Sequence, residues 1–558
     1  MDLKTFLAWD WQVVVALSAV ALAAAGVYYK IYYDYWKRRG FPELPFKPAP
    51  FFGHTTRLLL GRSNIIETFH DLYKYAGDKP LVGYFHGSQP SIMLRDPEII
   101  KHVLVKDFHA FVDRAFGLDD EIDPLNAKAL FNLRGQRWKE MRARLSPTFT
   151  SGRMKAMFPL MLACADELSA SWSKNIDKNR GEAIIEAKMK ECMACYSTDV
   201  IATCAFGIRC DALQNPETSE FRRMGKLIFE PTLRRRILLG IFVISPKLLK
   251  WTGMKFTDDL TSSFFRNFVQ DLVEKKEKAI EESEKTGGAI KTFGDFIHHL
   301  VLMKKRGFHF KDEVDEEDDQ SEVVNREQKK LKVEPSWANI DNEDLTAQVL
   351  LFFSAGFETT SSLLSFALYE LSASESGRAI QEKLREEVDR VMEEDGGKIT
   401  YEGLKRMDLL DRVLKETLRI HPPAGILTRN AVEPYKIPGT NLVIEKGMQL
   451  FISMHSIQLD EKYFPNPMHF DPDRFLPENK ENIKQFSYLP FGDGPRVCIG
   501  ERFAQMQVKL GLASVITQFE FEVCREKTDV PIRYKKTAFV LTSEQGIWLK
   551  VRHRRGKK

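Results

Sequence analysis

The chain has 558 residues, of which 43% are hydrophobic and 29% charged, and this balance allows a large core and excludes a disordered protein. Its formal net charge of +4 is too small for a nucleic-acid-binding protein, and the aromatic residues do not interleave with a basic stripe. The seven cysteines are irregularly spaced in a long chain, which is typical of reduced thiols facing the cytosol and argues against a disulfide scaffold.

The first element expected along the chain is a membrane anchor within residues 1–40. Residues 11–29 carry no charge, and as a helix they would rise about 28 Å, which is enough to cross the hydrocarbon layer. Aromatic residues flank this run and basic residues follow it, so the positive-inside rule places the rest of the chain in the cytosol. A cleaved signal peptide is the alternative, but no excess of positive charge precedes the apolar run.

A single globular body is expected over residues 41–558, after a proline-rich spacer that ends the anchor helix. Alternating patterns and turn residues predict β-structure at 82–94, 435–451 and 519–551, while helical periodicity dominates the rest. The expected fold class is therefore mainly α with small β-sheets. The highly charged segment 311–332 is expected to be a solvated surface loop, with an interaction segment as the alternative.

Two shorter segments invite a functional interpretation. The apolar stretch 237–244 has cationic flanks, and it fits either an element that dips into the lipid headgroup region or a buried core segment. Cys192 and Cys195 have metal-like spacing, but no second pair completes a site, so the pattern favours an apolar helix face.

A long apolar helix is expected over residues 344–371, with polar residues in its middle at Glu358, Thr359 and Thr360. These groups must be satisfied, because a stranded polar group inside a protein costs about 1–3 kcal/mol. Gly356 adds a weak point where a groove or bulge could admit water or dioxygen. In the alternative interpretation, Thr359 bonds back to the preceding turn and Glu358 points outward.

Two further pairs lie on expected helices. Trp138 and Arg142 are one helical turn apart, and both can donate hydrogen bonds to an anionic group, although a basic amphipathic surface helix is the plain alternative. Glu416 and Arg419 are three residues apart on a second helix, where an exposed pair would contribute only a few tenths of a kcal/mol.

Residues 491–500 read Phe-Gly-Asp-Gly-Pro-Arg-Val-Cys-Ile-Gly and surround a lone cysteine, Cys498. A metal-bound cysteine is ionised, and its thiolate needs positive dipoles nearby in an apolar pocket. Gly492, Gly494 and Gly500 allow backbone angles that a side chain forbids, so the loop can lie against a flat macrocycle and turn its N–H groups toward sulfur.

The surroundings of Cys498 complete this pattern. A helix expected from residue 501 would place its positive N-terminus near the sulfur. Arg496 can reach a carboxylate such as a haem propionate, and Phe491 can shield the thiolate from water. A buried cysteine behind a glycine-rich turn is the alternative, but so many specified positions in ten residues favour a haem thiolate.

With these motifs the chain resembles the cytochrome P-450 haem-thiolate monooxygenases. Residues 35–40 and 145–154 resemble microsomal members from insects and other arthropods. The resemblance covers essentially the whole chain and departs from the family mainly at the insert 311–332 and around Arg114. It implies the cytochrome P-450 fold with an N-terminal transmembrane helix, and haem b with Cys498 as the axial ligand of its iron.

The resemblance also assigns roles to individual residues. It implies that Thr359 orients oxygen for activation, that Glu358 is part of the proton supply, and that Thr360 is a helper. Trp138, Arg142 and Arg429 become candidate partners of the haem propionates beside Arg496 and the haem-loop residues, with Arg114 a weaker one. It further implies a structural network on the haem side of the fold: Glu416, Arg419 and Arg474.

The resemblance implies a monooxygenase that acts on lipophilic molecules, either xenobiotics or endogenous lipids and hormones. Electrons would come from NADPH through NADPH–cytochrome P-450 reductase, with cytochrome b5 as a further donor. The expected location is the endoplasmic reticulum membrane, with a single N-terminal anchor and the catalytic body on the cytoplasmic side. A peroxide isomerase or dehydratase on the same fold and a non-catalytic haem sensor are the alternatives, and Glu358 and Thr359 argue against both.

Overall fold

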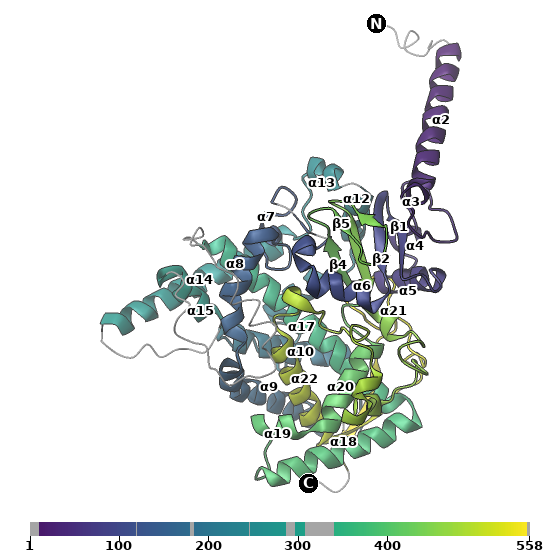
Figure 1. Cartoon of the computed structure of the whole chain (residues 1–558). Helices are drawn as coiled ribbons and strands as arrows, with labels where there is room; N and C mark the ends of the chain where they lie inside the picture. Colours follow the sequence, from purple (N-terminus) through teal and green to yellow (C-terminus); the bar gives the residue numbers. More distant parts are fainter. Residues whose placement is uncertain are drawn as a thin grey trace.

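The computed structural model of the protein describes residues 11–115, 117–118, 120–178, 184–244, 246–285, 296–306 and 340–554. The charged segment 311–332 lies outside these residues, so its role as a surface loop stays a prediction. Figure 1 shows a mainly helical body with small sheets to one side, which confirms the fold class expected from the sequence.

The helices of the described residues, in chain order, are α2 (Trp11–Tyr33), α3 (Tyr35–Arg38), α4 (Thr56–Leu59), α5 (Ile65–Tyr75), α6 (Pro97–Lys101), α7 (Pro124–Ala127), α8 (Gly135–Leu145), α9 (Ser151–Lys178), α10 (Met189–Ile201), α11 (Glu220–Phe229), α12 (Leu233–Ile244), α13 (Pro246–Thr252), α14 (Asp259–Lys285), α15 (Phe296–Arg306), α17 (Asn342–Ala373), α18 (Glu375–Glu394), α19 (Tyr401–Arg406), α20 (Asp408–Ile420), α21 (Met454–Gln458) and α22 (Glu501–Ile516). The strands are β1 (Leu81–His86), β2 (Gln89–Leu94), β3 (Ile184–Lys188), β4 (Ile426–Asn430), β5 (Tyr435–Lys436), β6 (Val443–Ile444), β7 (Gln449–Ser453), β8 (Phe519–Val523) and β9 (Trp548–His553).

The strands form one mixed sheet and two smaller antiparallel units. In the mixed sheet the order is β1-β2-β7-β4, and only the β2–β7 pair is parallel. The expected hairpin at 82–94 is confirmed as β1 and β2, joined by a tight turn. The pairs β5–β6 and β8–β9 confirm the two later regions, but β3 also pairs with β9. The sequence did not predict β3, which lies more than 300 residues before its partner strand.

Helix α17 runs through the helical body and packs against α10, α14, α18 and α22 (Figure 1). It starts at a capping box, in which the side chain of Asp341 accepts a hydrogen bond from the backbone N–H of Asp344 at 2.7 Å. The expected weak point at Gly356 is not observed, because α17 is continuous there. A Cβ atom at Gly356 would lie 2.8 Å from Cδ1 of Ile201, so this glycine instead lets α10 approach closely.

The N-terminal helix α2 projects from the body (Figure 1). Many of its described apolar side chains are exposed, including Val20 at 65% and Leu22 at 74%, whereas Tyr32 near its end is buried. Among the described residues, the helix identified as long and apolar enough for a membrane span is α17, which is mostly buried and is a core helix. The transmembrane anchor expected within residues 1–40 is therefore not shown and stays a prediction.

The apolar segment 237–244 belongs to helix α12. It was expected either to dip into lipid headgroups or to be buried in the core, and it is exposed on one side and buried on the other. Ile237 and Leu239 are exposed at 49% and 42%, whereas Leu238 and Val243 are buried. The helix thus has one apolar side packed on the protein and another that faces outward.

Candidate functional site

The loop that carries Cys498 has a tightly constrained backbone. Gly492 and Gly494 have φ angles of 78° and 72°, and a Cβ atom at Gly494 would collide with the backbone oxygen of Leu104. The corresponding expectation for Gly500 is wrong, since its φ of −93° is open to any residue. Gly500 matters through its backbone N–H, which bonds to the sulfur of Cys498 and favours the thiolate.

The Cys498 thiol is accessible although protein surrounds it on all sides. Burial raises its pKa, and the Gly500 N–H, Arg142 and Arg114 act in the opposite direction. The sulfur also lies just before the N-terminus of α22, where the helix dipole favours an anion. Half-buried Phe491 packs against the main core, and its carbonyl accepts the backbone N–H of Cys498 at 3.0 Å.

Four arginines from separate segments gather near Cys498. Burial lowers the pKa of Arg142 on α8 to about 10 and that of Arg429 on β4 to about 9. Burial, reinforced by the other guanidinium groups, lowers the pKa of Arg496 to about 7, and the pKa of Arg114 falls to about 10 for the same reasons. Asp113 lies 3.8 Å from Arg496 and offsets part of this charge. The cluster therefore holds an excess of buried positive charge.

Backbone carbonyls satisfy only part of these guanidinium groups. The bonds are Arg142 Nη1 to Val497 O at 2.9 Å, Arg429 Nη1 to Thr428 O at 2.9 Å, and Arg496 Nε and Nη2 to Val112 O and Leu133 O, both at 2.8 Å. The Nε atoms of Arg142 and Arg429 and the Nη1 atom of Arg496 are buried without a partner. Trp138 lies beneath Arg496, with its ring centroid 4.2 Å from the guanidinium carbon. The expected hydrogen bond from the Trp138 indole to an anion stays a prediction.

These surroundings fit a haem group. Buried donors without acceptors cost about 1–3 kcal/mol each, and uncompensated buried charge adds to that cost. A planar ligand with two carboxylates would supply both the acceptors and the negative charge, while an accessible thiol beside the cluster would supply an iron ligand. Among the described residues no cluster of three or more His, Cys, Asp or Glu side chains forms an alternative metal site.

The polar residues of α17 lie on different faces of the helix. Thr359 Oγ1 donates to Ala355 O at 2.7 Å, which is the backbone bond that the alternative interpretation expected. Ala355 is exposed and Thr359 half-buried, although α17 is a core helix, so this face of the helix is partly accessible. Glu358 does not point outward, because its Oε1 accepts a hydrogen bond from Lys190 Nζ at 2.6 Å.

Helix α22 connects the polar residues in the middle of α17 with the loop that carries Cys498. Thr360 Oγ1 donates a hydrogen bond, at 3.3 Å, to the side-chain oxygen of Gln507 on α22, the helix that begins just after Cys498. The polar centre of α17 and the cysteine loop therefore belong to one region of the fold. The sequence did not single out Lys190 or Gln507, because both contact α17 across long sequence distances and neither belongs to a local motif.

The expected network on α20 is observed. Arg419 donates from Nε and Nη2 to Glu416 at 2.7 and 2.8 Å, and both side chains are fully buried. Arg474 Nε lies 3.4 Å from Glu416. Arg419 also donates to the backbone carbonyls of Gln458 and Pro467, at 2.8 and 2.6 Å, which ties α20 to the segment that precedes the cysteine loop.

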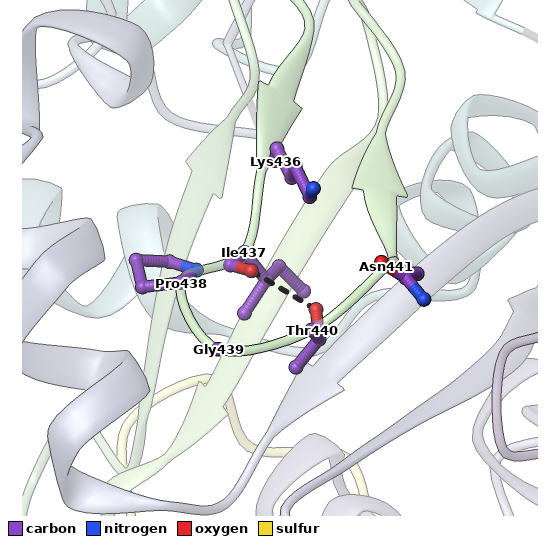
Figure 2. A pocket seen from close by; sticks show the side chains of 6 residues that line it. All are labelled: Lys436, Ile437, Pro438, Gly439, Thr440 and Asn441. Atoms are coloured by element: carbon purple, nitrogen blue, oxygen red, sulfur yellow. Dashed lines mark hydrogen bonds between the residues drawn. The ribbon is translucent and has the colours of Figure 1, made fainter.

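Two hollows in the described part of the chain bear on the site. One, of about 300 Å³, lies between α10, α11, α17 and residues 535–547, and Glu358 and Lys190 are part of its wall. The other lies inside the β5–β6 turn and is lined by residues 436–441 alone, with Thr440 Oγ1 donating to Ile437 O at 3.0 Å (Figure 2). It contains none of the predicted site residues, and a single surface turn offers no enclosed chemistry.

Comparison with known proteins identifies relatives over nearly the whole chain. The family model described as Cytochrome P450 matches residues 42–550. Cytochrome P450 9e2 of Blattella germanica is 38% identical over 98% of this chain and 98% of its own length. Cytochrome P450 6k1 of the same species is 39% identical over 95% of each chain, and Cytochrome P450 6a2 of Drosophila melanogaster is 37% identical over 96% of this chain and 98% of its own.

Proposed function

Since the chain belongs to the cytochrome P450 family and is a haem-thiolate monooxygenase, we propose that it oxidises lipophilic substrates with electrons from NADPH–cytochrome P-450 reductase. The substrates are xenobiotics or endogenous lipids and hormones, and cytochrome b5 is a second electron donor. The observation that carries the proposal is the accessible Cys498 thiol beside a cluster of buried arginines with unpaired donors.

Each residue of this cluster has a distinct task. The bound haem supplies the oxidative chemistry, and Cys498 is the ligand of its iron. Arg142, Arg429 and Arg496 hold the propionates through the donors that the protein leaves unpaired. Trp138 supports Arg496 from below, so the guanidinium keeps its direction.

Proton delivery is assigned to the middle of α17. The Thr359 hydroxyl lies on the accessible face of the helix, where it would hold and pass a proton for the chemistry that a bound haem would supply. Glu358 lines the pocket near α11, and we assign it the uptake of protons from that side of the helix.

The membrane location is part of the same proposal. Helix α2 serves as a single-pass anchor in the endoplasmic reticulum, with the body on the cytoplasmic side. Tyr32 near its end donates to Gly87 O at 2.9 Å, and Val243 of α12 packs against the same turn. The exposed Ile237 and Leu239 on α12 thus lie at the end of the body where the chain leaves the anchor, which favours contact with lipid there.

The thiolate assignment is tested by spectroscopy of the full-length protein. Reduced, carbon-monoxide-treated enzyme is expected to show the red-shifted Soret band of a thiolate adduct. Cys498→Ser should abolish this band, and Cys524→Ser, at another cysteine in the body, should keep it. Retention of the band in Cys498→Ser would overturn the assignment.

The reaction class is tested by turnover. Product should form from lipophilic candidates only when NADPH and the reductase are both present. Conversion of a lipid peroxide without any electron donor, together with no NADPH-dependent product, would favour the isomerase alternative instead.

A further inference from the structure

We propose that the hollow between α10, α11, α17 and residues 535–547 is a binding site for a medium-chain carboxylate. Cys498, the four arginines near it and Thr359 are not among the residues that line this hollow. It lies instead on the face of α17 that carries Glu358 and Ser362. The inference therefore goes beyond the proposed function, and it does not depend on the electron donor or on the reaction.

One part of the hollow is apolar and open to water. Phe539 is 74% exposed, and half-buried Phe229 and buried Val540 also line the hollow. Apolar surface that a ligand removes from water contributes favourably to binding. A hydrocarbon chain that lies along these side chains would therefore be stabilised.

The part of the wall formed by α10, α11 and the end of β3 is positively charged. Arg222 donates to Glu191 at 2.6 Å, and Nζ of Lys226 lies 3.6 Å from the same carboxylate. Lys188, at the end of β3, also acts on this group, so three cations surround one anion. Burial raises the pKa of Glu191, but the cations outweigh burial and hold this pKa below its ordinary value. The wall can therefore accept a second carboxylate.

Two buried polar atoms of residues in the wall have no hydrogen-bond partner among the described residues. They are Nε of Arg222, a residue that is 4% exposed, and Oγ of Ser543, a residue that is 5% exposed. Arg222 also bonds to Glu191 and to the thiol of Cys195. Unpaired polar groups are costly inside a protein, and both of these atoms can donate to a carboxylate.

The other charged side chains of the hollow do not cancel this preference. Lys190 and Glu358 form a pair at 2.6 Å, so they neutralise each other. Lys535, Glu230 and Glu544 are exposed, and water and salt screen their charges. In all, five cationic and four anionic side chains line the hollow, which favours an anionic ligand over a cationic one.

The size of the hollow limits the ligand further. Its volume of about 300 Å³ is at the lower end of the range for small-molecule pockets, about 300–1,000 Å³. This volume suits a carboxylate with a single chain of medium length and excludes a whole phospholipid. Decanoate is therefore a suitable probe.

The first test locates the ligand by photochemical labelling of the full-length, haem-loaded protein. The probe is a decanoate derivative with a diazirine at the end of its chain. Label is expected within residues 229–231 and 538–547, which carry apolar side chains of the hollow, and excess decanoate should prevent the labelling. Labelling confined to other segments would overturn the inference. Because labelling needs neither NADPH nor the reductase, its outcome is independent of the proposed reaction.

Competitors with the same chain length test the charge preference. Decan-1-ol and decylammonium should require concentrations roughly tenfold higher than decanoate to prevent the labelling, because neither can accept the charge-assisted hydrogen bonds of the wall. Equal competition by decan-1-ol would mean that the hollow recognises only hydrocarbon. Equal competition by decylammonium would mean that Glu230 and Glu544 dominate the site. Either result would reject a carboxylate site.

Two exposed side chains allow tests by substitution that leave the core intact. Lys226→Met removes a cation beside Glu191, and the Kd of decanoate, obtained from its competition with the probe, should rise roughly tenfold. Phe539→Ser removes the exposed ring and should also raise this Kd. The control is Lys383→Met, at an exposed lysine on α18 that does not line the hollow. An unchanged Kd in both Lys226→Met and Phe539→Ser, or an equal rise in Lys383→Met, would refute the proposed site.

Discussion

At the scale of single residues, the buried arginines around Cys498 lie in an environment that destabilises their charged forms when no anionic ligand is bound. Burial and mutual repulsion lower the pKa of Arg496 to about 7 and that of Arg429 to about 9, which means that their charged forms are destabilised. The same donors become favourable once anionic carboxylates lie beside them. The buried arginines therefore lower the stability of the haem-free chain and strengthen the binding of haem.

Arg429→Met tests whether a buried arginine lowers the stability of the haem-free chain while strengthening haem binding. Its guanidinium donates a hydrogen bond to Thr428 O at 2.9 Å, and its Nε is buried without a partner, so few contacts are lost with the charge. We expect haem to dissociate roughly tenfold faster, because a charge-assisted hydrogen bond contributes about 1.5–3 kcal/mol. The haem-free variant should be more stable than the haem-free wild type by about 1–3 kcal/mol, as judged by urea unfolding.

Arg385→Met is the matched comparison for Arg429→Met. Arg385 is equally buried but donates to Ile516 O, Phe519 O and Gln381, so its charge is well partnered. Its removal should destabilise the protein with and without haem. If both substitutions changed the unfolding free energy of the haem-free protein in the same direction, this account of the arginine cluster would be refuted.

Gly494 gives a second prediction at this scale. Its positive φ and the backbone oxygen of Leu104 leave no room for a side chain. Gly494→Ala is expected to lower the unfolding free energy by about 2–4 kcal/mol, through strain in the cysteine loop. Gly240→Ala is the control, since a Cβ atom there meets nothing within 4 Å, and its effect in the same thermal unfolding assay should be near zero or slightly stabilising.

Among the elements, α20 shows how burial changes the meaning of a short motif. Glu416 and Arg419 would be a weak pair on an exposed helix, but here both are fully buried and bonded. Breaking one partner leaves the other charged group without compensation in the core. The motif therefore connects α20 to the segment leading to the cysteine loop more strongly than its spacing alone indicates.

Glu416→Gln should accordingly lower the unfolding free energy by about 3–5 kcal/mol and accelerate haem loss. The control is Glu394→Gln, which removes the partner of Arg390 at 3.0 Å on the exposed part of α18. Glu394→Gln should lower the unfolding free energy by less than about 1 kcal/mol. Similar losses in denaturant titrations of the two variants would contradict the role assigned to the buried network.

Local patterns predicted the elements that local forces determine. Helix α17 was expected close to its observed bounds, α22 was expected to begin at residue 501, and Glu416 and Arg419 were expected on a helix, which is α20. The β1–β2 hairpin has its turn residues in sequence. Strand β3 was missed because its structure depends on pairing with β9, far along the chain. Gly356 was misinterpreted as a weak point because close packing against α10 is not visible in the sequence.

Over the whole molecule, the sequence identified residues that belong to motifs and missed those that the fold brings to them. Cys498 and Arg496 share one loop, so their spacing was informative. Arg114 was given little weight, yet it lies in the same charged cluster. Lys190 reaches Glu358 across 168 positions of sequence, and no local rule connects the two. Tertiary contacts of this kind require the fold itself.

Two buried histidines contribute to the response of the folded protein to acid. Burial lowers the pKa of His455 to about 3 and that of His86 to about 4, both below the ordinary 6.5. Each is neutral in the folded protein, while the unfolded chain binds protons as the pH falls below 6.5. Their contribution to stability is therefore complete above pH 6.5 and declines as the pH falls toward 4, by about 2 kcal/mol for each residue at pH 5.

His455→Phe isolates this effect, because both ring nitrogens of His455 are buried without hydrogen-bond partners and the aromatic replacement adds no polar group. Between pH 7.5 and 5 the variant should lose about 2 kcal/mol less unfolding free energy than wild type, as measured by urea titration of the haem-loaded protein. His109→Gln, at an exposed histidine 3.4 Å from Glu433, should follow the wild-type curve. Parallel curves for wild type and His455→Phe would mean that His455 becomes protonated in the folded protein, and the acid sensitivity would then have to come from the buried carboxylates.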